Sequence, residues 1–266
     1  MDNRIVFRRL HAEAFIIPNP WDIGSARLFA SLGFSALATT SSGHAATLGR
    51  PDGGVTRDEA IAHGHMLAGA TLLPVSADLE NGFGDNPKDV ALTIEQASAT
   101  ALAGCSIEDF SSESGLYESE LATARIVAAV EANRKNSSPL VLTARAENYL
   151  RGHPDLSDTI KRLQAFQEAG ADVLYAPGLT DLNEIQSILS SIDLPLNVLI
   201  MPGGPTSKDL FAAGVKRVSV GSAISLAAQA AAVVAARELL DEGTHEFWMK
   251  AIPHLGTINQ ALSKDD

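Results

Sequence analysis

The stretch LLPVSADLENGFGDNP, residues 72–87, decides how the rest of the chain is interpreted. It opens as a short apolar run, carries one carboxylate at Asp78 and a second at Glu80, and then breaks into a loop rich in Gly and Asn. Side chains two residues apart on a strand point to the same face, so we expect Asp78 and Glu80 to point together. Two like charges side by side are unfavourable unless water solvates them or a cation neutralises them. The stretch therefore indicates either a solvated acidic loop or a hard-metal site.

Short apolar runs recur along the whole chain, and an amphipathic stretch of helical length follows each one. We predict strands within residues 14–18, 35–40, 72–78, 104–109, 140–145, 172–177, 196–202 and 217–221. We predict helices within residues 22–32, 56–70, 88–103, 119–135, 157–169, 181–191, 206–213 and 223–241. Glycines follow several of these helices, as left-handed helix caps do, at Gly33, Gly104, Gly170 and Gly214.

Alternation of strands and helices predicts an α/β fold with parallel strands buried on both faces. Eight such units in 266 residues favour a (β/α)8 TIM-type barrel over an open doubly wound sheet. We assign residues 1–242 to this catalytic barrel and residues 243–266 to a C-terminal helical extension. The extension is more apolar than an exposed tail needs, with Trp248, Ile252 and Leu255 among its residues. It is expected to pack on a partner subunit, or alternatively on its own barrel.

The composition limits the partners and the location of the protein. A formal net charge of −12 argues against nucleic acid and against an anionic membrane surface. The N-terminal residues lack the apolar core of a secretory signal, and no unbroken apolar run has the length of a spanning helix. The lone Cys105 excludes a disulfide within the chain and suits a reducing compartment. We predict a cytoplasmic protein without a membrane partner.

Chemistry in such barrels sits at the carboxyl ends of the strands, and the acidic residues of this chain collect there. Asp78 and Glu80 follow the third predicted strand and Glu108 ends the fourth. Three carboxylates without a nearby His or Cys predict a site for Mg²⁺, or alternatively Mn²⁺. Arg145 ends the fifth strand, where it could grip a substrate carboxylate or serve as a structural partner of the acids. His44 is expected to act as a substrate contact, a general base or a plain loop residue.

Several motifs together resemble the isocitrate lyase and phosphoenolpyruvate mutase superfamily over residues 15–225. They are NPWDIGSARLF (19–29), TTSSG (39–43), LGRPDGG (48–54), SADLENGFG (76–84), AGCSIED (103–109), LTARAE (142–147), GADVLYAPGL (170–179) and VKRVSVGSA (215–223). The resemblance implies a magnesium-dependent enzyme for small 2-oxo acids or their enolates. It also implies a homotetramer or homodimer in which the C-terminal helix is exchanged between subunits.

The resemblance assigns roles to individual residues. It implies that Asp78, Glu80 and Glu108 hold the metal, and that Arg145 grips the substrate. It makes Asp52 the essential aspartate of the LGRPDGG loop, acting as a base or positioning a nucleophile. The segment Ser42, Gly43 and His44 falls where family members bind the carboxylate and oxo oxygen of the substrate.

One departure from the family pattern decides between the possible reactions. The isocitrate and methylisocitrate lyases carry a K-K-C-G-H loop with an acid/base cysteine, whereas this chain continues FSSESGLYESELATAR at 110–125, without Lys or Cys. Decarboxylation of oxaloacetate through a pyruvate-type enolate needs no such residue and fits best. The alternatives are a phosphonopyruvate or phosphoenolpyruvate C–P mutase or hydrolase, a 2-methylisocitrate-type lyase with His44 or Glu147 as substitute acid/base, and a non-catalytic ligand-binding barrel.

Overall fold

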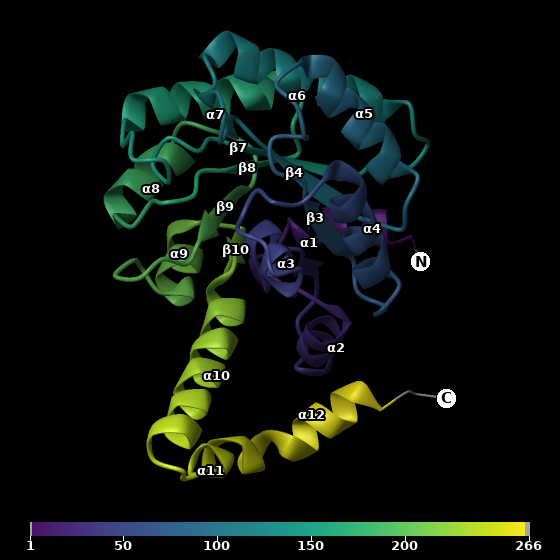
Figure 1. Cartoon of the computed structure of the whole chain (residues 1–266). Coiled ribbons are helices and arrows are strands. Elements are labelled where there is room, and N and C mark those ends of the chain that lie inside the picture. The colour runs from purple at the N-terminus through teal and green to yellow at the C-terminus, as the bar shows by residue number, and fades with distance from the viewer. Residues whose placement is uncertain (1, 264–266) are drawn as a thin grey trace.

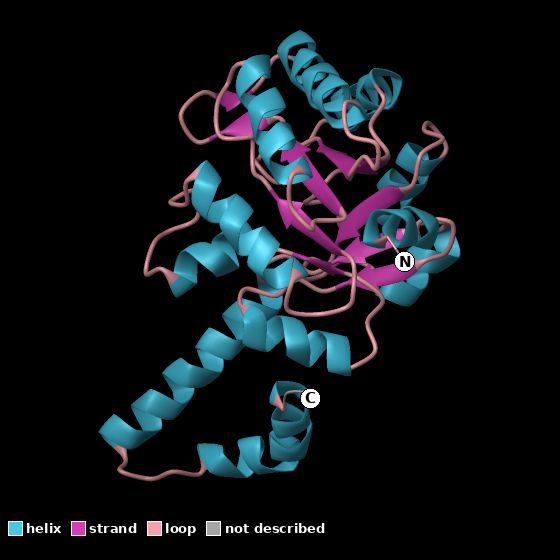
Figure 2. Cartoon of the chain, turned by 90° about the vertical axis from the view of Figure 1, so that its right-hand side faces the viewer, coloured by secondary structure: helices cyan, strands magenta, loops and turns pink. Residues whose placement is uncertain are grey.

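A ring of eight parallel strands forms the centre of the computed structural model, which describes residues 2–263 (Figures 1 and 2). In spatial order they are β1 (Phe15–Ile17), β10 (Arg217–Ser219), β9 (Leu196–Leu199), β8 (Val173–Tyr175), β7 (Val141–Arg145), β4 (Gly104–Glu108), β3 (Val75–Asp78) and β2 (Leu37–Ala38). Between the two outermost strands, the amide of Ala38 donates to the carbonyl of Pro18 at 3.0 Å. The side-chain amide of Asn19 donates to the carbonyl of Thr39, also at 3.0 Å. The predicted barrel is therefore confirmed.

A helix follows each strand or the loop after it, and all of these helices except the last, α10, cover the outside of the ring (Figure 2). These helices are α2 (Ile23–Ser31), α4 (Arg57–Ala68), α5 (Pro87–Ser98), α6 (Ser119–Arg134), α7 (Leu156–Ala169), α8 (Leu182–Leu189), α9 (Ser207–Ala213) and α10 (Ala223–Asp241). Side-chain caps fix many of their starts, as at Asp22 and Thr56, where both halves of a capping box form. Gly170 and Gly214 end α7 and α9 in the left-handed conformation, as predicted.

A helix that the sequence pattern did not indicate, α1 (Asn3–Leu10), closes the amino-terminal end of the barrel. Its Phe7 is fully buried in a small cluster with Phe15, Val141 and Val173. Gly104 does not cap a helix as predicted, because α5 ends at Ser98 and Gly104 begins β4. A Cβ atom on Gly104 would lie 2.7 Å from the Phe7 ring, so the missing side chain makes room for α1.

Two short elements replace loops that the sequence predicted at the other end of the barrel. Residues after β2 form the helix α3 (Ser41–Thr47), which begins with a Thr40 side-chain cap. After β4 the chain forms a hairpin of β5 (Phe110–Ser111) and β6 (Gly115–Leu116). Both elements stand at the carboxyl ends of the strands and form walls of the site described below.

The C-terminal arm projects from the barrel and returns to it (Figure 1). Helix α10 leads away, α11 (Phe247–Ala251) and a short turn, η1 (Ile252–His254), reverse the direction, and α12 (Leu255–Leu262) packs against α2. Residues 264–266 of the predicted extension lie outside the described residues. By length and composition alone, α10 is apolar enough to cross a membrane, which the sequence pattern did not indicate.

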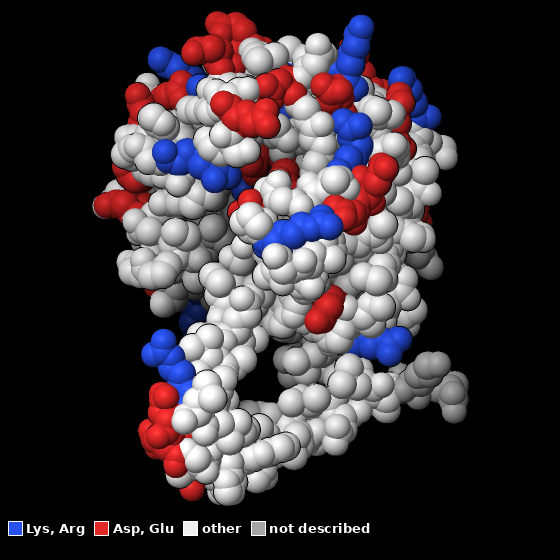
Figure 3. All heavy atoms as spheres, in the orientation of Figure 1, with Lys and Arg blue, Asp and Glu red and all other residues white. Residues whose placement is uncertain are grey.

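The arm carries many exposed apolar side chains. Figure 3 shows an opening between the arm and the barrel, with few charged residues on the facing surfaces. Large side chains that are at least half exposed are Leu226, Val233, Val234, Leu239, Leu240, Trp248, Met249 and Ile252. Monomeric soluble proteins rarely expose so much apolar surface, so the arm is a candidate for contact with another molecule.

Phe7→Ala is expected to lower the free energy of unfolding by about 3–5 kcal/mol, because it leaves a cavity in the floor of the barrel. Ile5→Ala is the matched control, since Ile5 lies on the same helix but is 47% exposed. Denaturant unfolding of the two variants measures the difference. Equal losses for both variants would show that α1 does not contribute to the core through Phe7.

Candidate functional site

Two adjoining cavities open at the carboxyl ends of the strands. The inner cavity, of about 160 Å³, lies within the ring of strands and is lined by Asp78, Tyr175, Asn197 and Arg217 among others. The outer cavity, of about 650 Å³, lies between the loop after β3 and the β5–β6 hairpin. Both cavities share Ser41, Asp52, Arg145 and Leu150 in their walls. The polar residues of the site therefore surround one connected region.

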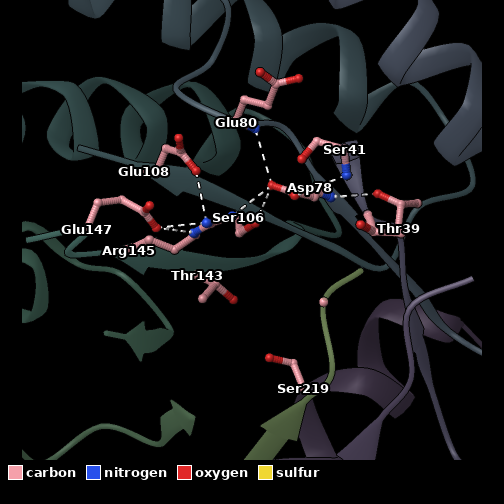
Figure 4. A network of polar contacts seen from close by, with 12 residues as sticks. Thr39, Ser41, Asp78, Glu80, Ser106, Glu108, Thr143, Arg145, Glu147 and Ser219 are labelled. Atoms are coloured by element: carbon pink, nitrogen blue, oxygen red, sulfur yellow. Dashed lines mark hydrogen bonds and ion pairs between the residues drawn. The ribbon is translucent and has the colours of Figure 1, made fainter. Parts of the chain in front are cut away.

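Arg145 is the centre of the polar network at the junction of these cavities (Figure 4). Its guanidinium group donates to Asp78 at 2.9 Å, to Glu108 at 3.0 Å and to Glu147 at 2.7 Å. The three carboxylates come from the ends of β3 and β4 and from the residues after β7. Burial lowers the pKa of Arg145, but the charges of Glu147, Glu108 and Asp78 together hold it well above its ordinary value.

A second guanidinium supports the network from the outer side. Arg151 donates to Glu147 at 3.0 Å and to Glu108 at 3.3 Å, and its guanidinium lies over the ring of Phe110 in the hairpin. Burial raises the pKa of Glu108 well above its ordinary value, while Arg145 lowers it. The network thus holds two buried carboxylates, Glu108 and Glu147, between two arginines.

Glu80 does not point with Asp78, contrary to the expectation from strand alternation. Strand β3 ends at Asp78, and Glu80 has a left-handed backbone with φ of 48°, so the two-residue alternation stops before it. Figure 4 shows its side chain directed away from Arg145. Its Oε1 atom is buried without a hydrogen-bond partner. Burial, followed by the charges of Asp78 and Asp52, raises the pKa of Glu80 to about 7.

The three predicted metal ligands therefore lie in one region but are not gathered around one point. Within residues 2–263, no group of three or more His, Cys, Asp and Glu side chains is close enough to hold a metal ion. Arg145 binds Asp78 and Glu108 in the space that they share. The donor chemistry nevertheless fits a hard cation, since six acidic and only two basic side chains line the outer cavity. Among these acidic side chains, Glu80 has an oxygen without a hydrogen-bond partner that could bind a cation.

The segment predicted to bind the substrate lies on α3. Ser42 lines the inner cavity, and the amide of Ser41 donates to Asp78 at 3.3 Å. Gly43 is buried, and a Cβ atom there would lie 2.5 Å from a Thr40 methyl carbon, so the residue must be small. The helix thus presents its first turn to the cavity and to Asp78.

His44 lies behind this turn and not in either cavity. Its ring stacks on His63 with centroids 3.7 Å apart, and its Nδ1 atom is buried without a partner. Burial lowers the pKa of His44 and lowers that of His63 to about 4, so both rings are neutral at pH 7. This placement favours the structural interpretation of His44 over the general base.

The remaining candidates differ in exposure. Asp52 is exposed on the loop before α4 and lines both cavities. Cys105 is fully buried in β4, and burial raises the pKa of its thiol to about 12, so it is no nucleophile. Asp85 fixes the hairpin by accepting hydrogen bonds from the hydroxyls of Ser114 and Tyr117. The short acidic segment at 110–116 is therefore an ordered wall of the outer cavity.

Sequence reasoning did not find three polar residues of the site. The sequence pattern does not single out Arg151, Tyr175 and Arg217, although Tyr175 lies within an apolar run and Arg217 begins one. The register explains how they come together: Arg145 pairs with Tyr175, Tyr175 with Asn197, and Asn197 with Arg217. Paired residues on parallel strands share a face, which here is the interior of the barrel.

Comparison with known proteins agrees with this architecture. A family model described as phosphoenolpyruvate phosphomutase matches residues 7–240. A crystal structure of a putative lyase/mutase from Burkholderia cenocepacia is similar, with a TM-score of 0.94 and 48% identity, covering 99% of this chain and 96% of that one. An uncharacterized protein of Mycobacterium tuberculosis is 38% identical over 88% of this chain and 89% of its own length. An oxaloacetate decarboxylase of Pseudomonas putida is 30% identical over 85% of this chain and 81% of its own length.

Glu80→Gln is expected to change how stability depends on pH in protein kept metal-free with EDTA. The pKa of Glu80 in the folded protein, about 7, lies above its ordinary value of 4.5. Between these pH values the folded parent holds a proton on Glu80 that the unfolded chain has lost, so the parent loses stability as the pH rises from 4.5 through 7. At about 1.4 kcal/mol per pH unit, the variant should be more stable than the parent by up to about 3 kcal/mol at pH 8 and by nothing near pH 4. Glu113→Gln, on the exposed hairpin turn, is the control. Denaturant unfolding across this pH range measures the free energy of unfolding. Parallel pH dependences for the parent and Glu80→Gln would contradict the raised pKa of Glu80.

Proposed function

The chain belongs to the phosphoenolpyruvate mutase and isocitrate lyase superfamily, and from this we propose that it is a magnesium-dependent lyase of a small 2-oxo acid. The proposed reaction cleaves the C–C bond one carbon away from the oxo carbon and so leaves a pyruvate-type enolate, with decarboxylation of oxaloacetate as the first reaction to test. The relative from Pseudomonas putida carries the name of that reaction. The observation that carries the proposal is the composition of the two adjoining cavities. Arg145 and several carboxylates line them, and the described residues of their walls include no Cys, His or Lys.

The chemistry of the lining limits the reactions that fit. Lyases that protonate or deprotonate a carbon need a general acid or base at the reacting atoms. Loss of CO₂ from C4 of oxaloacetate needs an electron sink at the C2 oxo group and a held substrate instead, and the resulting enolate can take its proton from water. A site with arginine, carboxylates and small polar groups supports the second requirement better than the first.

Magnesium is the cofactor that we propose for this site. Members of the superfamily generally depend on a divalent metal. Asp78, Glu80 and Glu108 would hold it, and the excess of acidic over basic side chains in the outer cavity supports this. When bound, the ion supplies positive charge to the oxygen on which the enolate develops.

The residues of the chain have separate proposed roles. Arg145 has five N–H groups, and the network uses four of them, so it can grip a substrate carboxylate once an acid is released to the metal. Ser42, Gly43 and His44 place the first turn of α3 beside the substrate, with Ser42 facing the cavity. Asp52 lies where the two cavities join and positions the reacting end of the substrate.

We propose in addition that the protein is a homodimer or homotetramer in which a second copy covers the arm. Helix α12 packs on its own barrel through α2, but α10 and α11 have little cover within the chain. A second copy of the same surface would bury the apolar residues of α10 without requiring a membrane. A cytoplasmic location and an exchanged helix remain predictions.

Pyruvate release from oxaloacetate is expected to require Mg²⁺ and to stop in EDTA. Asp78→Asn and Glu108→Gln should each lower kcat/KM by at least about 100-fold, since losing a metal ligand removes several kcal/mol of transition-state stabilisation. Glu95→Gln, on the outer surface, is the control and should keep full activity. Full turnover in EDTA would refute the mechanism. Phosphate release from phosphonopyruvate without pyruvate release from oxaloacetate would favour the C–P alternative.

Leu240→Asp is expected to weaken assembly, because it places a charge on the apolar surface of the arm. Leu240 is 84% exposed within the single chain, and Leu72, which is 95% exposed on a loop before β3, provides the matched control as Leu72→Asp. Sedimentation velocity should show a smaller species for the first variant only. A monomeric parent protein would refute the proposal.

A further inference from the structure

The inner cavity reaches a second arginine inside the barrel. Arg217 begins β10, lines the cavity and is only 5% exposed. Three strand pairings connect it to Arg145, through Tyr175 on β8 and Asn197 on β9. Figure 4 shows Thr143 and Ser219, two neighbours of this region, on the far side of the Arg145 network from Glu80.

Every hydrogen-bond partner of Arg217 is neutral. Its guanidinium donates to the side-chain oxygens of Asn197 and Thr143, each at 2.9 Å, and to Nε2 of His11 at 3.2 Å. Because Nδ1 of His11 contacts the carbonyl of Phe7 at 2.9 Å, Nδ1 carries the proton and Nε2 accepts. Burial, and then the charge of Arg217, lowers the pKa of His11 to about 3, so this imidazole stays neutral.

The positive charge of Arg217 has no counterpart within the described part of the chain. No carboxylate there lies within ion-pair distance of it, whereas Arg162, which is similarly buried, pairs with Asp109 at 3.0 Å and Asp158 at 2.7 Å. Burial lowers the pKa of Arg217 to about 10, which still leaves it charged at pH 7. A buried charge is costly unless an opposite charge accompanies it, so an anion is the group that this arrangement lacks.

The cavity has both the donors and the room for such an anion. Three of the five N–H groups of Arg217 are used, which leaves two. The hydroxyls of Ser219 and Tyr175 line the same cavity beside it. The volume of about 160 Å³ is below the range of about 300–1,000 Å³ typical of drug-sized ligands, so it suits a small organic acid.

We propose that Arg217, with Ser219 and Tyr175, forms a buried subsite for the second carboxylate of a small dicarboxylic substrate. The subsite rests on the proposed function, because it places the other end of the same acid beside Arg145. Arg217 here binds substrate and does not activate it: the carboxylate that it holds is the one that leaves as CO₂ and loses its charge, so the charge-assisted hydrogen bond stabilises the bound substrate at least as much as the transition state. The subsite thus selects dicarboxylic over monocarboxylic oxo acids.

Binding of succinate and butyrate, two acids of equal chain length, tests the subsite without any turnover. Thermal unfolding at fixed Mg²⁺ concentration and ionic strength should show succinate binding on the order of 10- to 100-fold more tightly than butyrate to the parent protein. Arg217→Met should reduce this preference to near unity, and Arg217→Lys, which keeps the charge, should retain part of it. Arg134→Met, at the exposed end of α6, is the control and should keep the full preference.

Three outcomes would overturn the proposal. One is an equal preference for succinate over butyrate in the parent and in Arg217→Met. Another is that chloride, compared with gluconate, raises the thermal stability of the parent as much as succinate does and that this effect is lost in Arg217→Met. The site would then bind a free inorganic anion. The third applies if Arg217→Met does not fold, when Arg217→Lys takes its place. Because Arg217→Lys keeps the positive charge, a preference for succinate over butyrate near unity in this variant counts against the subsite.

Kinetics separate this proposal from the proposed reaction. With oxaloacetate, Arg217→Met should raise KM by about 10- to 100-fold without lowering kcat, because the lost contact contributes to binding only. If the parent protein binds dicarboxylates through Arg217 but does not turn over oxaloacetate, the reaction assignment fails and the subsite stands. If the parent turns over oxaloacetate with an unchanged KM in Arg217→Met, the subsite fails and the reaction stands.

Discussion

The ion-pair network around Arg145 is the interaction on which the site depends. Four carboxylate and guanidinium side chains from three strand ends meet there, at the point where parallel strands bring their carboxyl ends together. Like-charged Asp78, Glu108 and Glu147 repel one another, and Arg145 offsets this repulsion by pairing with all three. The Arg145 guanidinium bridges these acids, which is why they converge although no three of them surround one point.

The barrel interior holds two arginines that differ in their surroundings. Arg145 has three carboxylate partners, whereas Arg217 has only neutral ones. One cavity connects them, so a small acid with a charge at each end would meet a positive group at each end of that cavity. Small polar residues in the middle of the barrel, such as Ser76 and Ser106, leave this space open where barrels usually carry bulky branched side chains. The apolar floor formed by α1 separates the space from solvent at the other end.

The segment between β4 and α6 shows how this chain departs from its superfamily. Where the lyases carry an acid/base cysteine, residues 110–116 form a short hairpin that Asp85 fixes to the loop after β3. The hairpin contributes Phe110, which supports Arg151, and adds acidic charge to the outer cavity. The family scaffold is thus retained, and the segment after β4 forms a structural wall of the outer cavity.

The sequence by itself determined the barrel and the end of it at which Asp78, Glu108 and Arg145 collect. Each predicted strand overlaps an observed one, because buried parallel strands read as apolar runs, and residues such as Asp78, Glu108 and Arg145 were identified by following those runs to their ends. Tertiary structure alone decided what local patterns do not encode. The left-handed backbone turned Glu80 away from Asp78, the register aligned Arg217 with Arg145, and Phe7 reached Gly104 across about 100 residues of chain. The physical reason is that periodicity fixes which face of its own element a side chain occupies, whereas its charge partners and cavities depend on elements far away in sequence.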